Sequence, residues 1–204
     1  MLSTSNLKSA QAATYFEKDD YYSQVEGPNQ SRWVGEGAER LNLNGGVEQE
    51  TFQQVLQGKS PDGQPLFSRR TDPTTRRAAT DFTFSAPKSV SVAALVQGDQ
   101  RVIQAHHAAV DRALQVLEER YAQTRVRRGS GIREKVATGN VIAATFRHET
   151  SREQDPQLHT HCVVINATQI EDGKWQSLSN EEILNNQKLL GEIYQNELAH
   201  QLRS

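Results

Sequence analysis

Residues 146–166 read FRHETSREQDPQLHTHCVVIN, and this stretch decides the fold because it holds parts of two candidate strands that both carry histidine. Along the second strand, residues two apart share a face, so His159 and His161 project together. The run before it, residues 140–148, also has strand composition and ends at His148, and the Ser, Asp and Pro between the runs are typical of a connection. An antiparallel pairing of the two strands would bring the three imidazoles together.

Three clustered imidazoles form a candidate metal site. Neutral imidazole binds divalent transition metals, and three protein nitrogens leave positions open for water or a substrate oxygen, as in catalytic sites. A zinc hydrolase would use the same ligands, and polar residues on the solvent face of a hairpin are a third interpretation. The single cysteine, Cys162, lies in the apolar part of the second strand, so we expect it to pack as a small hydrophobic residue.

Length and composition indicate one domain. The chain has 204 residues, 35% of them hydrophobic, which is enough for a full core. No segment approaches the ~20 apolar residues that cross a membrane, and the N-terminus lacks the apolar core of a signal peptide. One cysteine excludes an internal disulfide, so we expect a reducing compartment such as the cytoplasm.

Charge is distributed unevenly along the chain. A net charge of -2 argues against a generic nucleic-acid binder, but residues 120–152 contain eight Lys or Arg and only two Glu. Two strand-like runs around Gly129 and Gly131 predict a basic hairpin suited to DNA phosphates, carrying Arg125, Arg127, Arg128, Arg133 and Lys135. A solvated charge run without function is the alternative. Three further cations, Lys88, Arg147 and Arg152, are close in sequence to the candidate site motifs, so we expect them to contact the bound nucleic acid near that site.

The remaining patterns predict strands and helices without regular alternation, which favours an α+β fold with a largely antiparallel sheet flanked by helices. Expected strands are residues 1–8, 81–85 and 175–178, and expected helices are 9–16, 47–57, 87–96, 99–123 and 179–204, the last capped by Ser179. Residues 17–46 and 60–77 are expected to be irregular.

Three of the five tyrosines, Tyr15, Tyr21 and Tyr22, fall within eight positions near the N-terminus. A phenol with a pKa of ~10 is a poor nucleophile at neutral pH unless a metal or a base eases its ionisation. Beside the candidate metal site a tyrosine could attack a phosphorus atom. Clustering alone favours ordinary packing or exposure.

Five motifs occur in order along essentially the whole chain: NLKSAQAATYFEKDDYY (6–22), RWVGEGAERL (32–41), TDFTFSAPKSVSVAALVQGD (80–99), TGNVIAATFRHETSREQDPQLHTHCVVIN (138–166) and GKWQSLS (173–179). Together they resemble the MobF-type conjugative relaxases, the TraI and TrwC family of HUH endonucleases. Members nick single-stranded DNA at a plasmid transfer origin through a covalent 5′-phosphotyrosine and rejoin the ends. An HxH motif alone would be weak evidence for this family, whereas the combination of these motifs is highly specific for it.

The resemblance implies roles for individual residues. His148, His159 and His161 match the ligands of a divalent metal, Mg²⁺ or Mn²⁺, with other transition metals binding in vitro. Tyr15 matches the first nucleophile. Asp81 matches an acidic residue that either orients a ligand histidine or accepts the proton of the nucleophile, and we favour orientation.

A second tyrosine pair in the family matches Tyr21, with Tyr22 as a substitute. The chain departs from the family at Phe16, where relatives commonly carry a tyrosine after the first nucleophile. Any role of that neighbouring phenol is therefore absent.

The resemblance also implies a wider context. Residues 1–204 would form the palm domain of a relaxase, truncated on its C-terminal side. Expected partners are single-stranded DNA, the hairpin of the transfer origin, and conjugation accessory and coupling proteins, with no small-molecule substrate and no membrane span. The expected location is the bacterial cytoplasm, with transfer to the recipient. Alternatives are a rolling-circle replication initiator or transposase of HUH type, and a DNA-binding module that does not cleave.

Overall fold

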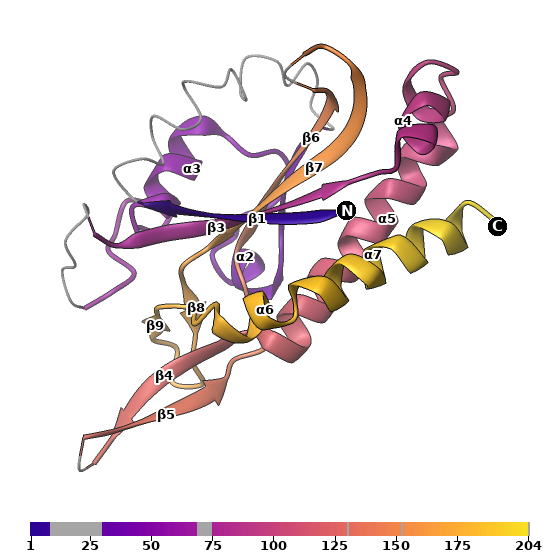
Figure 1. Ribbon diagram of the computed structural model, residues 1–204. Coiled ribbons are helices and arrows are strands. Elements are labelled where there is room, and N and C mark those ends of the chain that lie inside the picture. Colours follow the sequence, from indigo (N-terminus) through magenta and orange to yellow (C-terminus); the bar gives the residue numbers. More distant parts are fainter. Residues whose placement is uncertain (9–29, 69–74, 130, 152, 204) are drawn as a thin grey trace.

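A five-stranded antiparallel sheet forms the centre of the computed structural model, which describes residues 1–8, 30–68, 75–129, 131–151 and 153–203 (Figure 1). The strand order is β1-β3-β7-β6-β2. The strands of this sheet are β1 (Leu2–Lys8), β2 (Ser31–Val34), β3 (Arg77–Ser85), β6 (Ala143–Thr150) and β7 (Pro156–Ile165). The α+β prediction is confirmed, and the two histidine-bearing strands occupy the middle of the sheet.

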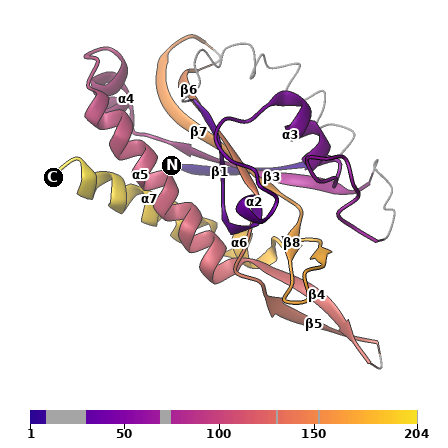
Figure 2. The same cartoon turned by 180° about the vertical axis from the view of Figure 1, so that it is seen from behind.

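Helices cover both faces of the sheet, as Figures 1 and 2 show from opposite sides. The helices are α2 (Glu36–Arg40), α3 (Gln49–Leu56), α4 (Lys88–Leu95), α5 (Gln100–Val116), a π-helical turn η1 (Leu117–Tyr121), α6 (Glu181–Asn185) and α7 (Gln187–Gln201). Two small hairpins complete the fold, β4 (Gln123–Arg128) with β5 (Ile132–Ala137) and β8 (Thr168–Gln169) with β9 (Trp175–Gln176).

Two hydrophobic cores result from the alternation of side chains along the strands. On one face, Phe82 and Phe84 of β3 pack with residues of α5 and α7, among them the fully buried Tyr194. On the other face, Phe146 of β6 packs with Phe52 of α3, with ring centroids 5.3 Å apart. Because both faces are buried, a one-residue slip of any central strand would exchange its core side chains, so the register is strongly specified.

The β6–β7 register sets the candidate site. His148 lies directly opposite His159, and His161 lies opposite Phe146. The three imidazoles therefore share the face covered by α3, beyond the end of its apolar core. The predicted antiparallel pairing of these two strands is confirmed.

Several boundaries differ from those predicted. The helix expected over residues 99–123 ends in the η1 turn, and β4 already begins at Gln123. The helix expected over residues 179–204 is divided at Asn186 into α6 and α7. Ser179 does not cap it, because its backbone N–H donates to the Gln123 carbonyl and Asn180 is the N-cap of α6.

The stretch predicted to be irregular, residues 17–46, contains both β2 and α2 in its described part. Strand β2 pairs with the edge of β6, Trp33 opposite Ala144, and Trp33 is buried against Phe52. The expected helix over residues 9–16 lies outside the described residues. The prediction was wrong for 31–40 because the polar composition concealed a short strand whose stability comes from pairing with β6.

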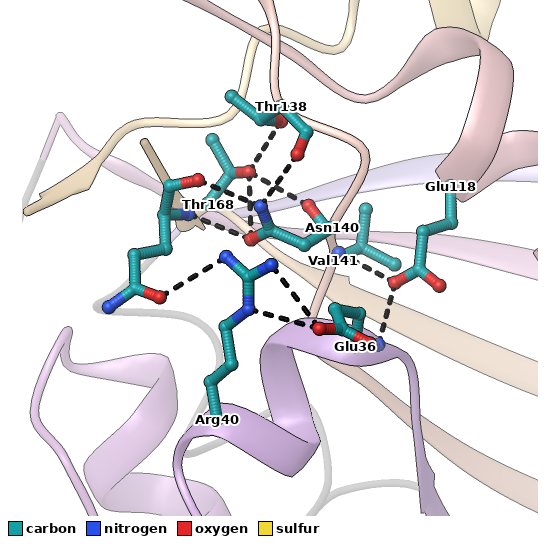
Figure 3. Close-up of polar contacts among 8 residues, drawn as sticks. Glu36, Arg40, Glu118, Thr138, Asn140, Val141 and Thr168 are labelled. Atoms are coloured by element: carbon teal, nitrogen blue, oxygen red, sulfur yellow. Dashed lines mark hydrogen bonds and ion pairs between the residues drawn. The ribbon is translucent and has the colours of Figure 1, made fainter. Parts of the chain in front are cut away.

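A buried asparagine joins the root of the β4–β5 hairpin to β8 (Figure 3). Asn140 Nδ2 donates to the carbonyls of Thr138 at 2.9 Å and Gln169 at 2.7 Å, and Asn140 Oδ1 accepts from the Gln169 N–H at 2.8 Å. The hydroxyl of Thr168 donates to the Asn140 carbonyl at 2.8 Å. One side chain thus satisfies three backbone groups where β5, β6 and β8 meet.

Glu118 of η1 makes a second junction beside it, also drawn in Figure 3. Its carboxylate accepts from the backbone N–H groups of Glu36 and Val141, both at 2.8 Å. Gly37 donates to the Val141 carbonyl at 3.0 Å, and a Cβ on Gly37 would lie 2.7 Å from that oxygen. The Gly-Glu-Gly sequence of the second motif therefore permits α2 to approach the start of β6.

Candidate metal centre and DNA interface

The rings of His148, His159 and His161 form a triangle on the sheet. Their centroids are 5.4 Å (His148 to His159), 5.4 Å (His148 to His161) and 5.2 Å (His159 to His161) apart. The structure thus brings together the three histidines that the sequence singled out. His161 is buried, whereas the other two are partly exposed at the end of the sheet.

Asp81 fixes the orientation of His161. The Asp81 Oδ2 atom lies 2.7 Å from His161 Nδ1, and both side chains are buried. Thr83, the register partner of His161, places its hydroxyl 3.0 Å from the same nitrogen. A carboxylate only accepts, so Nδ1 carries the proton and the lone pair of the neutral ring is on Nε2.

His159 is oriented in the same sense by backbone. Its Nδ1 lies 2.9 Å from the carbonyl oxygen of Gln157, which also only accepts. The neutral His159 ring therefore presents Nε2 as a ligand nitrogen. In histidines that bind metals, the ring nitrogen that is not a ligand typically donates to a carboxylate or a carbonyl in this way.

The spacing of the rings fits one metal ion. With metal–nitrogen bonds of about 2.1 Å, two imidazoles at angles of 90° to 109° have centroids about 4.6–5.3 Å apart. The observed separations of 5.2–5.4 Å are close to the upper value. As the side chains are placed, no group of three or more His, Cys, Asp or Glu in the described part of the chain could hold a metal ion, so the rings would have to turn for all three to bind one.

Burial favours the neutral form of His148 and His159. Burial, with smaller contributions from His161 and His159, lowers the pKa of His148 to about 3. Burial also lowers the pKa of His159, against the opposing effect of its hydrogen bond to the Gln157 carbonyl. At neutral pH both rings therefore carry the lone pair that a metal requires.

The basic hairpin β4–β5 projects away from the sheet (Figure 1). Arg127 lies opposite Arg133 in its ladder, and both are exposed. Nearer the root, Arg125 donates to Glu181 at 2.8 Å, and Lys135 lies 3.2 Å from the same carboxylate. The distal cations are thus open to a ligand, whereas the proximal ones already have acidic partners on α6.

A polar hollow of about 780 Å³ lies between this hairpin and the sheet. Four arginines, Arg77, Arg125, Arg127 and Arg133, line it together with Glu181. This charge balance is suited to an anionic ligand.

Two further predicted DNA contacts differ in position. Lys88 is exposed at the start of α4 and donates to the Pro156 carbonyl at 3.2 Å, beside a groove of about 680 Å³ that Gln157 also lines. Arg147 lies on the opposite face of β6 from His148. Its guanidinium is 3.2 Å from His107 Nε2 and only 14% exposed. Arg147 is therefore close to the cluster in sequence but separated from it by the sheet.

Some predicted site residues fall outside the described residues: Tyr15, Tyr21, Tyr22 and Arg152, as well as the side chain of Arg128. Their roles stay predictions. Conversely, the sequence analysis missed Thr83. Its signal was present, because Thr83 alternates with Asp81 along DFTFS and so had to share its face.

Among the helices in the described part of the chain, none has the length and apolar character needed to cross a membrane.

Comparison with known proteins extends over the whole chain. The family model described as TrwC relaxase matches residues 9–204. Two proteins named multifunctional conjugation protein TraI are similar in sequence. The one from Escherichia coli is 45% identical over 215 residues, and the one from strain K12 is 44% identical over 216. Each alignment covers 100% of this chain and 12% of the relative, so the chain spans a small part of their length.

Solved structures of the conjugative relaxase TrwC are also similar. A metal-free complex with oriT DNA has a TM-score of 0.88 at 42% identity, covering 100% of this chain and 69% of that one. A metal-bound complex with oriT DNA has a TM-score of 0.85 at 44% identity, covering 100% and 70%. Sequence and fold agree over nearly all 204 residues, and on these grounds the chain belongs to the TrwC relaxase family.

Proposed function

We propose that this chain nicks single-stranded DNA at a plasmid transfer origin and rejoins it, acting as a metal-dependent strand transferase. The observation that carries the proposal is the cluster of three histidines with Asp81 hydrogen-bonded to one of them. Support comes from relatives, since TrwC has been solved with oriT DNA and with bound metal, including copper.

The proposed ligands are His148, His159 and His161, and the ion is Mg²⁺ or Mn²⁺. Such an ion would supply charge neutralisation at the non-bridging oxygens of the scissile phosphate. Asp81 holds the proton on His161 Nδ1, so that Nε2 stays available as a ligand. Burial lowers the pKa values of His148 and His159, so protonation of these two rings does not compete with metal binding at neutral pH.

In the proposed reaction the phenol oxygen of Tyr15 attacks the phosphorus atom in line with the leaving 3′ oxygen. A bond forms between tyrosine and phosphorus, the bond from phosphorus to the 3′ oxygen breaks, and the 3′ end leaves as a hydroxyl. The 5′ phosphate stays on the protein as a tyrosine ester. The reverse attack by a 3′ hydroxyl restores the strand, and Tyr21 or Tyr22 performs a second transfer.

The proposed DNA interface is the basic hairpin, with Arg127, Arg128 and Arg133 at its distal half and Arg125 and Lys135 near its root. Lys88 contacts the strand near the cleavage site. Arg147 and Arg152 complete the proposed set, and for Arg147 a contact with DNA requires that its side chain leave the partly buried position beside His107. The proposed setting is a bacterial cytoplasm with accessory and coupling proteins, and the nicked strand carries the protein to the recipient.

The test of this assignment is His161→Ala. The variant should lose Mn²⁺ binding and nicking of an origin oligonucleotide while keeping its affinity for the origin hairpin, since the hairpin interface is a separate surface. Cleavage at the wild-type rate would refute the ligand assignment. The matched control is His200→Ala, an exposed histidine on α7, which should retain both activities.

A further inference from the structure

A buried chain of polar side chains lies beneath β7, on the face opposite the histidine cluster. His106 of α5 is placed between Tyr194 of α7 and Thr160 of β7. Its Nδ1 is 2.8 Å from the Tyr194 hydroxyl, and its Nε2 is 2.8 Å from the Thr160 hydroxyl. His106 and Tyr194 are 0% exposed and Thr160 is 5% exposed, so the chain connects three elements inside the core.

Thr160 links this series of hydrogen-bonded side chains to the candidate metal site. Thr160 stands between His159 and His161, and the alternation of the strand points its hydroxyl away from them. A backbone segment of three residues thus carries two proposed ligands on one face and a tether to α5 on the other.

A second contact holds β7 two residues earlier, at Leu158. The backbone N–H of Leu158 donates to the Ser91 hydroxyl of α4 at 3.0 Å. The backbone N–H of a strand points along the plane of the sheet, so the Leu158 contact holds β7 sideways, whereas the contact of the Thr160 side chain with α5 acts across the plane. Thr160 is therefore fixed in height relative to α5.

Packing alone does not account for a polar chain here. Valine would fill the volume of the Thr160 side chain without a hydroxyl that must be satisfied, and the surrounding core is apolar. The hydrogen bonds add a fixed position and direction to the backbone that apolar packing does not provide. A buried hydroxyl with one partner holds its backbone in one position, whereas apolar contacts tolerate small shifts.

We propose that Thr160 and His106 are positioning residues of the candidate metal centre. Their hydrogen bond sets the height and tilt of β7 over α5, and this sets how closely the His159 and His161 rings approach, 5.2 Å between centroids. The proposal rests on the proposed function in one respect, that the three histidines bind a metal ion.

The test compares Thr160→Val with Thr160→Ser, measuring Mn²⁺ affinity by titration calorimetry well below the unfolding temperature of each variant. Valine removes the hydroxyl at nearly constant volume and should weaken Mn²⁺ binding about tenfold, at the lower end of the ~10–100-fold known for residues that support ligands. Serine keeps the hydroxyl and should bind almost as tightly as the wild type.

Two control variants separate positioning from general stability. Thr145→Val removes a buried hydroxyl from the same face of β6, where it donates to the Arg32 carbonyl at 3.2 Å, and no proposed ligand is adjacent. Tyr194→Phe removes the hydroxyl at the far end of this series of hydrogen bonds and keeps the contact between His106 and Thr160. Both should lower the unfolding temperature and leave Mn²⁺ affinity close to that of the wild type.

The outcomes are distinct. Weaker Mn²⁺ binding in Thr160→Val alone supports the proposal. Equal Mn²⁺ affinity of Thr160→Val and the wild type overturns it. A loss of Mn²⁺ affinity that parallels the loss of unfolding temperature across all the variants also overturns it. If the wild-type protein binds no Mn²⁺ at all, the metal centre of the proposed function fails, and the positioning role falls with it.

Discussion

Asp81 and His161 meet diagonally across the β3–β7 ladder: Asp81 Oδ2 lies 2.7 Å from His161 Nδ1, although the register partner of His161 is Thr83. Both residues are buried. Such a contact directs the carboxylate at Nδ1 and leaves Nε2 to the proposed metal ion, which is the arrangement expected of an orienting residue.

Replacing Asp81 by Asn separates orientation from base catalysis. If Asp81 orients His161, Asp81→Asn should weaken Mn²⁺ affinity about 10–100-fold and reduce nicking in proportion, as for other residues that support ligands. Calorimetry, and a nicking assay at a Mn²⁺ concentration below the wild-type dissociation constant, provide the two measurements. Unchanged Mn²⁺ affinity with slow nicking would instead identify Asp81 as the proton acceptor. Asp172→Asn, an exposed carboxylate paired with Lys174, is the control.

Stability should fall as the pH is lowered from 7 to 5. The pKa values of His106 and His148 are both lowered to about 3, chiefly by burial, against about 6.5 in an unfolded chain. Between these values the unfolded state binds more protons, so acid favours unfolding, by about 1.4 kcal/mol per pH unit for each histidine. Above pH 6.5 this effect vanishes.

Urea unfolding of His148→Gln at pH 7, 6 and 5 checks this pH effect. In this variant the free energy of unfolding should fall less steeply as the pH is lowered. His200→Gln, which changes an exposed histidine, should keep the pH dependence of the wild type. A wild-type free energy of unfolding that is constant from pH 7 to 5 would contradict the burial of neutral rings.

Arg127 and Arg133 should supply phosphate contacts that depend on salt. Each lost contact should lower the slope of log affinity against log salt by about 0.9 for duplex DNA, or about 0.7 for a single strand. Arg127→Ala and Arg133→Ala therefore weaken binding most at low salt, as measured by fluorescence anisotropy with a hairpin oligonucleotide. Arg101→Ala, an exposed arginine paired with Asp99 on α5, should change neither affinity nor slope. An unaltered slope in both hairpin variants would remove the β4–β5 hairpin from the interface.

The approach of α2 to β6 should tolerate no side chain at Gly37. A Cβ there would lie 2.7 Å from the Val141 carbonyl oxygen, so backbone must move, at a cost of about 1–3 kcal/mol. The gain in helix propensity from Gly37→Ala, roughly 0.5–1 kcal/mol, does not offset this cost. Gly46→Ala, whose Cβ would have its nearest neighbour at 4.0 Å, should leave the unfolding temperature unchanged. Equal stability of the two variants would contradict the close junction.

The histidine cluster could be predicted from sequence because its information is local. Alternation fixes the shared face of His159 and His161, and a polar connection between two strands favours an antiparallel pair. The register that places His148 directly opposite His159 was not predicted, because it depends on the length and path of the connection between the strands.

Other features depend on partners that the sequence does not reveal. Strand β3 begins at Arg77, four residues before the predicted start, because Ala79, a weak strand former, is paired with both neighbouring strands, and Ala78 and Ala79 are fully buried. The helical spacing of α5 indicates that His106 is buried, four residues after Val102 on the apolar face. Its contact with Thr160 required the packing of α5 against β7.

We propose that this chain forms a covalent bond with DNA through Tyr15, with a metal ion held by the three histidines. The most direct measurement incubates the wild-type protein, Tyr15→Phe and His161→Ala with Mn²⁺ and a single-stranded oligonucleotide carrying the transfer origin, followed by denaturing electrophoresis. The account predicts an adduct that resists denaturation in the wild type and is lost in both variants. An adduct of equal yield in Tyr15→Phe and His161→Ala, or none in a wild-type protein that binds both Mn²⁺ and the oligonucleotide, would contradict it.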